Sequence, residues 1–578
     1  MSSNSLYRAD KAFPDHWRWR IFALPEIPEN DLTGPFGTEL ETGGRRIAGQ
    51  TLEFPPSGQI LLSDFSEDSP AFLLVCDFTE SGAGKAVIGV GADWRLVLKI
   101  NGTVLCDTRK TGNGEVHYEA DDHKQEFSYP AGANQLSMLV ICGRSSRLAA
   151  ARLFPAEHSA LKHPPWCAFP DSRTGSVRIT FTTTLPCPAG IDFREKGSEE
   201  WRRVYDSTGG RINRQKTVHQ IRLDGLAPDR EYEYRTVLLD ELVRWEEIVG
   251  TEIHHFRTLP DSDRIFRFNF TADLQVSGEM IREFAQQMKK QEADFTVFAG
   301  DPIWTSDFER DYLERTFLPL AEAAAGQPMV AVRGNHEMYG KDTERFFDYF
   351  SAPPELGREG YYAFRCGEVC FTVLDFCDDE GRCPWPSTRI LHDIEPYLEQ
   401  EERWLRDLVE QPFWREAKWR IVLAHALPAG DFKKYLPDHV RKMIDPLFAG
   451  DPPQYRIHLW LGGHIHYAMR SIPGQNRIRA AIAPEERYPD IRADLRKYPF
   501  PVASVSGPSR LNPPGHGTSF FAVTVEPEKL TVRAIDDTGK QFDSITISSS
   551  GEVIGEEPDA IFRLREIPLP RNLKKYQI

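Results

Sequence analysis

The sequence has no apolar run that approaches the roughly 20 residues needed for a membrane-spanning helix. Its first ten residues, Met1 to Asp10, also have no apolar core of the kind found in secretory signals. Internal repeats and low-complexity tracts are absent too. We therefore expect a protein with no membrane span that stays in the cytoplasm.

Closely spaced pairs of cysteines are also missing. The nine cysteines are scattered, and no Cys-x-x-Cys motif occurs. A loose cluster contains Cys366, Cys370, Cys377 and Cys383. Two interpretations of this cluster remain open, a zinc site and a set of buried free thiols, and the spacing favours free thiols.

A surplus of basic residues is absent. The formal net charge is -16, which disfavours binding to nucleic acid or to anionic membranes. The same charge does not exclude a small phosphate ester as substrate, because bound cations would reverse the local electrostatic field.

The composition is that of a globular protein of several domains. The 578 residues are 40% hydrophobic and 27% charged, and this length predicts about three domains. Residues 1–157 read as a β-sandwich, because short apolar runs alternate with Gly, Asn and Asp turns. Asn101-Gly102 follows an alternating run and predicts a hairpin turn.

This first segment resembles the galactose-binding-like modules that accompany many hydrolases. The resemblance implies a glycan as a ligand of the N-terminal module. The alternative, which the sequence favours, is a β-sandwich that only supports the rest of the protein.

Residues 160–260 predict a second β unit. Residues 177–183 alternate as a half-buried strand. The segment from Leu226 to Tyr232 resembles the tyrosine corner of fibronectin type III sandwiches. A similar sandwich precedes the catalytic domain in purple acid phosphatases. The resemblance implies that Tyr232 has a structural role and is not a site residue.

Residues 263–545 alternate between strands and helical stretches, which is typical of an α/β domain, and residues 546–578 are predicted to be a C-terminal extension. Polar residues follow the ends of the apolar strands in this domain. Ligands bind at the carboxyl ends of strands in open α/β sheets, so we expect these side chains to converge. They are Asp273, Asp301, Asn335, His336, His425, His464 and His466.

Carboxylate, amide and imidazole groups are typical ligands of divalent cations. The ordered runs Gly300-Asp301, Gly334-Asn335-His336-Glu337 and Gly463-His464-Ile465-His466 complete the pattern. This order resembles the calcineurin-like metallophosphoesterase family. The resemblance implies that the α/β domain is a four-layer α/β/β/α sandwich. The fold expected for the whole chain is therefore two N-terminal all-β sandwiches followed by this α/β domain.

The same resemblance implies a role for each residue. Asp301 would bridge two metals. Asp273 and His466 would bind the first metal, and Asn335, His425 and His464 would bind the second. His336 would be the catalytic acid, because an imidazole has a pKa near working pH.

Two positions depart from the family pattern. Gln275 stands where the family usually has a histidine ligand, and Trp304 stands where purple acid phosphatases have a tyrosine. Gln275 could supply a carbonyl oxygen, directly or through water. Mn, Fe, Zn and Mg are the candidate metals, and an oxygen-rich first site favours Mn.

Two neighbouring residues have open roles. Glu337 is interpreted either as a partner that orients His336 or as a carboxylate that begins a helix. Arg333 is interpreted either as a phosphate-binding residue or as part of a structural salt bridge.

The function expected from these residues is hydrolysis of small phosphate esters, as a phosphatase or a phosphodiesterase. The two metals would activate a hydroxide, and His336 would act as the general acid. The alternative is a binding or scaffolding protein whose metal site is impaired by Gln275.

Overall fold

The computed structural model describes most of the chain. The described residues are 13–114, 118–143, 147–154, 158–169, 175–240, 246–262, 264–275, 278–324, 326–350, 359–375, 391–428, 438–466, 468–481, 492–507 and 518–569. They divide into two compact units. The first comprises Met1–Ala160 with Leu238–Ile248, and the second comprises Leu161–Val237 with Val249–Ile578.

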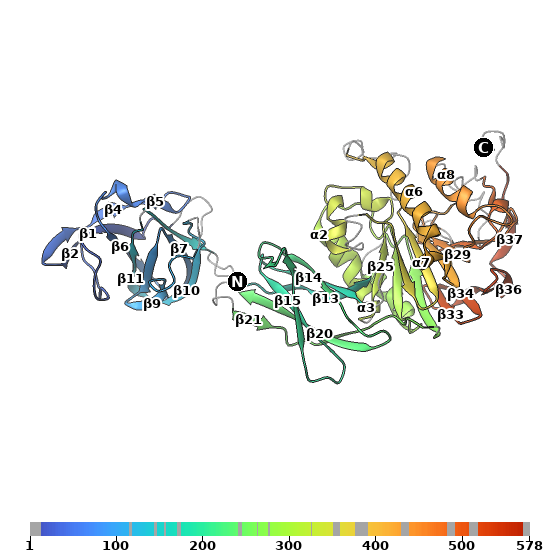
Figure 1. The fold of residues 1–578 in the computed structure, drawn as a ribbon, viewed down its shortest axis with the longest axis horizontal. Coiled ribbons are helices and arrows are strands. Elements are labelled where there is room, and N and C mark those ends of the chain that lie inside the picture. Colours follow the sequence, from blue (N-terminus) through green and yellow to red (C-terminus); the bar gives the residue numbers. More distant parts are fainter. Residues whose placement is uncertain are drawn as a thin grey trace. The chain divides into compact units, whose positions relative to one another are not determined.

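The first unit is built from two antiparallel sheets, coloured blue to cyan in Figure 1. The larger sheet has the order β4-β1-β6-β11-β8-β9, and the smaller has the order β10-β7-β12-β5. One hydrophobic core joins the sheets, because buried side chains from both belong to it, such as Phe72 and Val90. The strands are β1 (Arg18–Leu24), β4 (Gln50–Leu52), β5 (Gln59–Leu61), β6 (Ala71–Glu80), β7 (Gly84–Ala92), β8 (Arg95–Ile100), β9 (Thr103–Asp107), β10 (His123–Tyr129), β11 (Gly132–Ile141) and β12 (Leu148–Phe154), with a separate hairpin of β2 (Glu39–Thr42) and β3 (Arg45–Ala48).

The hairpin predicted at Asn101-Gly102 is confirmed. β8 pairs antiparallel with β9 across this turn. Both turn residues have positive φ, 48° at Asn101 and 84° at Gly102. This is the geometry that matches the twist of the two flanking strands.

More β structure follows from Leu161 onward. β13 (Leu161–Phe169), β14 (Val177–Thr183) and β19 (Val218–Leu223) belong to a ten-stranded sheet. A five-stranded sheet contains β15 (Ala189–Glu195), β16 (Arg202–Tyr205), β20 (Glu231–Asp240), β21 (Glu246–Val249) and β22 (His254–Arg257), and β17 (Ser207–Thr208) pairs with β18 (Arg211–Ile212).

Tyr232 makes the contact that the tyrosine-corner interpretation predicts. Its buried hydroxyl accepts a hydrogen bond from the backbone N–H of Ala227 at 2.8 Å. This bond ties the start of β20 to the preceding turn, as in other β-sandwiches.

Strand pairing crosses the boundary expected near residue 263. β13 pairs in parallel with β25 (Met329–Val332), with Ala168 opposite Met329 and Phe169 opposite Val330. The ten-stranded sheet therefore runs without a break, in the order β19-β14-β13-β25-β24-β23-β33-β34-β35-β36. Its other strands are β23 (Phe266–Thr271), β24 (Phe295–Ala299), β33 (Ser519–Val525), β34 (Lys529–Asp536), β35 (Gln541–Ser548) and β36 (Val553–Glu556).

A second, eight-stranded sheet has the order β26-β27-β28-β29-β32-β30-β31-β37. Aromatic rings connect the two sheets, since Phe371 lies 5.2 Å from Phe268 and 5.5 Å from Phe295. The strands are β26 (Tyr362–Cys366), β27 (Val369–Leu374), β28 (Trp419–Ala424), β29 (Leu459–Gly462), β30 (Met469–Ser471), β31 (Arg477–Ala480), β32 (Val502–Ser504) and β37 (Arg563–Glu566).

Helices pack on both sheets through apolar faces (Figure 1). Helix α1 buries Ile281, Phe284, Ala285 and Met288, which recur at helical spacing. Ile281, Phe284 and Met288 contribute to the core of the ten-stranded sheet. Side chains of α6 and α8 pack with Val422 and Trp460 of the eight-stranded sheet. The helices are α1 (Gly278–Lys289), α2 (Glu309–Tyr312), α3 (Leu318–Ala324), α4 (Phe346–Tyr349), α6 (Ile394–Glu410), α7 (Pro412–Arg415) and α8 (Asp438–Phe448). Shorter turns are the π-helix Leu313–Phe317 and the 3-10 segments Leu62–Asp64, His336–Met338, Thr343–Arg345 and Leu495–Lys497.

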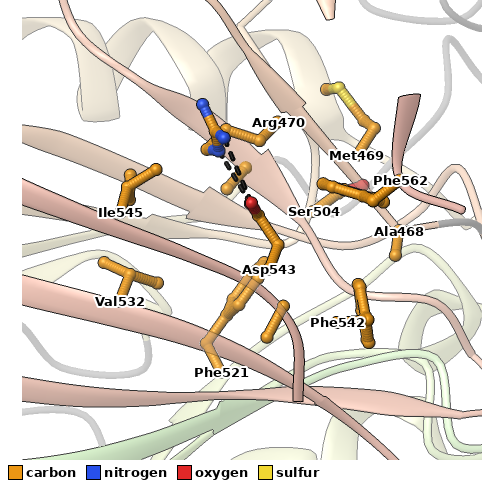
Figure 2. A pocket seen from close by; sticks show the side chains of 12 residues that line it. Ala468, Met469, Arg470, Ser504, Phe521, Val532, Phe542, Asp543, Ile545 and Phe562 are labelled. Atoms are coloured by element: carbon orange, nitrogen blue, oxygen red, sulfur yellow. Dashed lines mark hydrogen bonds and ion pairs between the residues drawn. The ribbon is translucent and has the colours of Figure 1, made fainter. Parts of the chain in front are cut away.

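Part of the predicted C-terminal extension is built into this region. β36 joins the ten-stranded sheet and β37 joins the eight-stranded sheet. Near them, buried Arg470 pairs with Asp543 at 2.8 Å (Figure 2) and with Glu556 at 3.1 Å. The adjoining cavity is only about 10 Å³, room for about one water molecule. This pair therefore links the two sheets, and the cavity does not form a ligand site.

The chain is thus multidomain and mostly β, with a β-rich N-terminal region ahead of a C-terminal domain of paired sheets and helices. None of the helices in the described ranges is long and apolar enough to span a membrane.

Candidate metal centre

The predicted ligands follow the carboxyl ends of strands, and both sheets contribute. Asp273 follows β23, Asp301 follows β24 and Asn335 follows β25, all in the ten-stranded sheet. His425 follows β28, and both His464 and His466 follow β29, in the eight-stranded sheet. The strands before these residues are almost wholly buried, so the polar groups lie at the first positions where the chain leaves the core.

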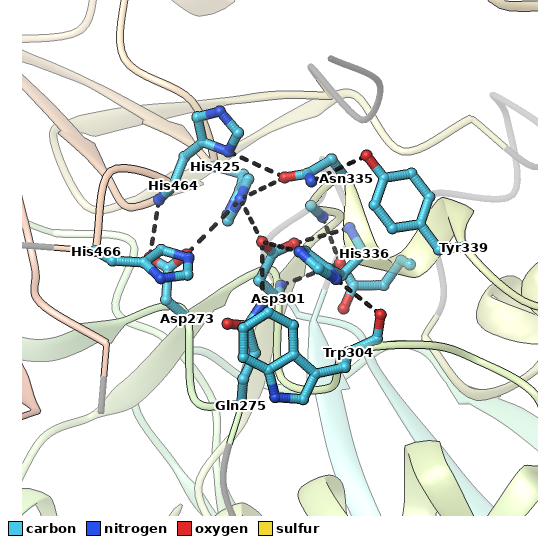
Figure 3. A network of polar contacts seen from close by, with 12 residues as sticks. Asp273, Gln275, Asp301, Trp304, Asn335, His336, Tyr339, His425, His464 and His466 are labelled. Carbon is cyan, nitrogen blue, oxygen red and sulfur yellow. Dashed lines mark hydrogen bonds and ion pairs between the residues drawn. The ribbon is translucent and has the colours of Figure 1, made fainter. Parts of the chain in front are cut away.

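These side chains form two groups that share one carboxylate (Figure 3). Asp301, His425 and His464 make one group, and Asp273, Asp301 and His466 make the other. In each group the candidate ligand atoms lie within 4.8 Å of one another. Asp301 thus stands where one carboxylate could bridge two cations.

Asn335 completes the first group. Its Oδ1 lies 3.2 Å from Nε2 of His425 and 3.0 Å from Nδ1 of His464. Nε2 of His425 is also 3.1 Å from Oδ2 of Asp301. Four candidate ligand atoms, two nitrogens and two oxygens, therefore lie close together.

The second group fits a cation for a different reason. Oδ1 of Asp273 is buried and has no hydrogen-bond donor, although Nε2 of His466 lies 3.2 Å away. Burying a carboxylate oxygen without a donor is costly. A divalent cation held by Asp273, Asp301 and His466 would remove that cost.

Four of the ligand residues have unusual backbone conformations. Asp273, Asp301, His464 and His466 have φ angles of 56°, 55°, 69° and 57°. Each such angle costs a non-glycine residue about 1–3 kcal/mol and persists only where the surrounding structure enforces it. Hydrogen bonds tie these loops together, since the N–H of His464 donates to the Asp273 carboxylate at 2.8 Å and that of His336 donates to the Asp301 carboxylate at 2.9 Å.

Backbone carbonyls select the tautomers of two histidines. Nδ1 of His425 donates to the carbonyl of Ala299 at 2.7 Å, which leaves Nε2 free to face Asp301 and Asn335. Nδ1 of His336 donates to the carbonyl of Trp304 at 2.8 Å. A carbonyl can only accept, so in each ring Nδ1 carries the hydrogen and Nε2 is available for chemistry.

The electrostatics of the centre are strongly coupled. Burial opposes ionisation of Asp301, but the charges of His425 and His336 hold its pKa well below the usual range. Burial also opposes protonation of His425, yet the Asp301 carboxylate raises the pKa of His425 to about 9. A bound cation would take the place of that proton.

Residues 266–468 match the family model described as calcineurin-like phosphoesterase. This segment is a calcineurin-like phosphoesterase domain. The family and the paired ligand groups make the protein a metal-dependent phosphoric ester hydrolase with divalent metal cofactors. No curated protein gives a significant match to the chain.

Two similar solved structures are phosphatases. A purple acid phosphatase from yellow lupin (Lupinus luteus) seeds is 14% identical, with a TM-score of 0.48, and the match covers 83% of this chain and 93% of that chain. A dimetal phosphatase from Danio rerio is 15% identical, with a TM-score of 0.34, and the match covers 49% and 99%.

The position of Glu337 agrees with its interpretation as a carboxylate at the start of a helix. It lies in the first turn of the 3-10 segment His336–Met338. Its buried carboxylate accepts from the backbone N–H groups of Gly334 at 2.6 Å and Asp301 at 3.1 Å. Burial and the nearby Asp301 carboxylate raise the pKa of Glu337 to about 8. Glu337 therefore ties the Asn335 loop to the Asp301 loop, while His336 is held by Trp304.

Arg333 makes the structural salt bridge that one of its two interpretations expects. Its buried guanidinium pairs with Asp375 at 2.8 and 3.3 Å and lies 5.0 Å above the ring of Phe347. Asp375 also accepts a hydrogen bond from Tyr397. These contacts bear out the interpretation of Arg333 as part of a structural salt bridge.

Gln275 lies beside the shared carboxylate. The side chain is half-buried, and its Nε2 lies 3.5 Å from Oδ2 of Asp301. The amide oxygen and nitrogen of a glutamine can be exchanged by a flip, so the same position can present the oxygen that the sequence interpretation requires.

Two other expectations concern cysteines. Cys377 and Cys383 lie outside the described residues. Cys366 and Cys370 are buried, and burial raises the pKa of both thiols, that of Cys370 to about 12. These two thiols have the character of core residues.

Sequence reasoning missed the part played by Trp304. In the sequence Trp304 is distinguished only by replacing a tyrosine, but its carbonyl is the group that orients His336. A backbone carbonyl leaves no trace in residue type, so no sequence signal could have identified this contact.

Proposed function

We propose that this protein hydrolyses small phosphate esters at a centre of two divalent metals, with His336 as the general acid. The observation that carries the proposal is the sharing of Asp301 by two groups of metal-binding side chains. Asp273 and His466 would hold one cation, and Asn335, His425 and His464 would hold the other. Mn is the favoured metal because the group of Asp273, Asp301 and His466 is rich in oxygen ligands. When bound, the cations supply Lewis-acid chemistry and a nucleophilic water.

His336 has the geometry that this role requires. The Trp304 carbonyl accepts a hydrogen bond from Nδ1–H of His336, and Nε2 of the same ring lies 3.8 Å from Oδ2 of the shared Asp301. A proton on Nε2 is therefore next to the position where an ester oxygen would leave. The side chain is 14% exposed, so the proton can be replenished from water.

The test combines metal content with turnover. Elemental analysis after Mn reconstitution should find two metals per chain. Replacement of His336 by alanine should leave that number unchanged and lower kcat by about 10²–10⁴-fold, the usual contribution of a general acid. His255→Ala is the matched control, since His255 is an exposed histidine on β22.

Each result decides something different. Unchanged turnover in His336→Ala would remove its catalytic role. Fewer than two metals per chain would contradict the binuclear centre. A chain without metal and without activity would leave the binding or scaffolding alternative.

A further inference from the structure

Trp304 stands out among the tryptophans of the described residues. Six of them are at most 4% exposed: Trp17, Trp19, Trp166, Trp414, Trp419 and Trp460. Trp304 is 58% exposed, although it lies only three residues after the shared Asp301. Phe308, on the same segment, is 55% exposed. Exposed aromatic surface close to a catalytic centre has to be explained by something other than core packing.

The position of the indole relative to the acid is well defined. The ring of Trp304 lies edge-on to the ring of His336, with centroids 5.3 Å apart and an interplanar angle of 82° (Figure 3). The backbone carbonyl of Trp304 holds His336 at the same time. The indole and the proton donor are therefore parts of one local unit.

This arrangement places the indole beside the leaving group. Nε2 of His336 gives its proton to the departing oxygen, so the group attached to that oxygen begins next to His336. The exposed indole presents an apolar π-surface there. Flat aromatic groups stack on such a surface, whereas a short alkyl group covers little of it.

We propose that Trp304 selects phosphate esters whose leaving group is a planar aromatic, such as an aryl or nucleobase-bearing group. This inference rests on the proposed function, because it uses His336 as the proton donor. Trp304 contributes recognition through its side chain and orientation of His336 through its backbone. Replacement of the side chain keeps the carbonyl, so the two contributions can be separated.

The experiment measures binding of two stable phosphonates to the full-length, Mn-reconstituted chain by calorimetry. Phenylphosphonate and methylphosphonate carry the same metal-binding group and differ only in the substituent. Wild type should bind the phenyl compound about tenfold more tightly, the scale of one aromatic stacking contact. Trp304→Ala should abolish this preference, and Trp304→Phe should retain most of it.

Trp94→Ala is the matched control, because Trp94 is 40% exposed and lies in the first unit. It should leave the preference unchanged. A preference that survives in Trp304→Ala, or that wild type lacks, would overturn the inference, and so would failure of either phosphonate to bind. Hydrolysis of phenyl phosphate, measured on the same samples, tests the proposed function separately. A lack of hydrolysis with a Trp304-dependent preference would refute only the catalytic proposal.

Discussion

At the scale of single residues, Glu337 links the two loops that supply ligands. One carboxylate oxygen accepts from the N–H groups of Asp301 and Gly334, and Oε1 is buried without a hydrogen-bond partner. Neither donor can reach water, because the side chain of Glu337 is fully buried beside them. Its role is to position Asp301 and Asn335 rather than to touch substrate.

Removal of this acceptor should therefore destabilise the centre. We expect Glu337→Ala to lower the free energy of unfolding by about 1–3 kcal/mol, because two buried N–H groups lose their acceptor. It should also lower metal content. Glu337→Gln keeps an acceptor oxygen, so its losses of unfolding free energy and of metal content should be much smaller. Urea unfolding and elemental analysis measure both effects, and equal losses in the two variants would contradict the assigned role.

At the scale of elements, the loops after β24 and β25 approach each other closely. A Cβ at Gly334 would lie 2.3 Å from Oδ1 of Asp301. Gly334 is not among the glycines with positive φ, so a left-handed turn does not explain it. A glycine is needed there because a Cβ would have no space. Positive φ angles occur instead at Gly300, Asp273, Asp301, His464 and His466.

Gly334→Ala should for this reason displace Asp301 or its loop. We expect it to abolish binding of at least one metal and to reduce turnover below detection. Gly555→Ala is a suitable control, because its nearest atom would be 3.8 Å away, on Thr546. Elemental analysis measures the metal content of both variants. A full complement of metal in Gly334→Ala would contradict this prediction and show that the loops can relax.

At the scale of the whole molecule, the second β segment and the phosphoesterase domain share one sheet and one core. β13 pairs with β25, the strand that leads to Asn335. Trp166 of β13 is 3% exposed and belongs to the same hydrophobic cluster as Phe284 of α1 and Leu320 of α3. The first unit has a core of its own.

Thermal unfolding should reflect this division. We expect Trp166→Ala to destabilise the second unit, phosphoesterase domain included, by about 3–5 kcal/mol, the usual cost of a buried tryptophan. Calorimetry of the full chain should show a lower Tm for that transition and an unchanged transition for the first unit. Trp19→Ala, in the core of the first unit, should lower the Tm of the first unit's transition and leave that of the second unit unchanged. If both variants shifted both transitions equally, the two units would not unfold independently.

Local patterns in the sequence were sufficient for much of the fold. The Asn101-Gly102 hairpin follows from the φ angles that these residues tolerate, and the contact of Tyr232 follows from a short segment. The pairing of β13 with β25 was not predictable, because it joins residues more than 150 positions apart and leaves no periodic signal. The pairings of β36 and β37 were not predictable either, because both strands lie in the segment expected to be a C-terminal extension.

The sequence by itself determined which residues can bind metal and where each stands along the chain. A polar side chain just past a buried apolar strand lies at a sheet edge, and this rule depends only on local hydrophobicity. Tertiary structure alone decided which groups meet. The partners of Glu337, Arg333 and His336 are two backbone amides, Asp375 and a backbone carbonyl. Such contacts depend on the packing of distant loops, and residue types do not encode them.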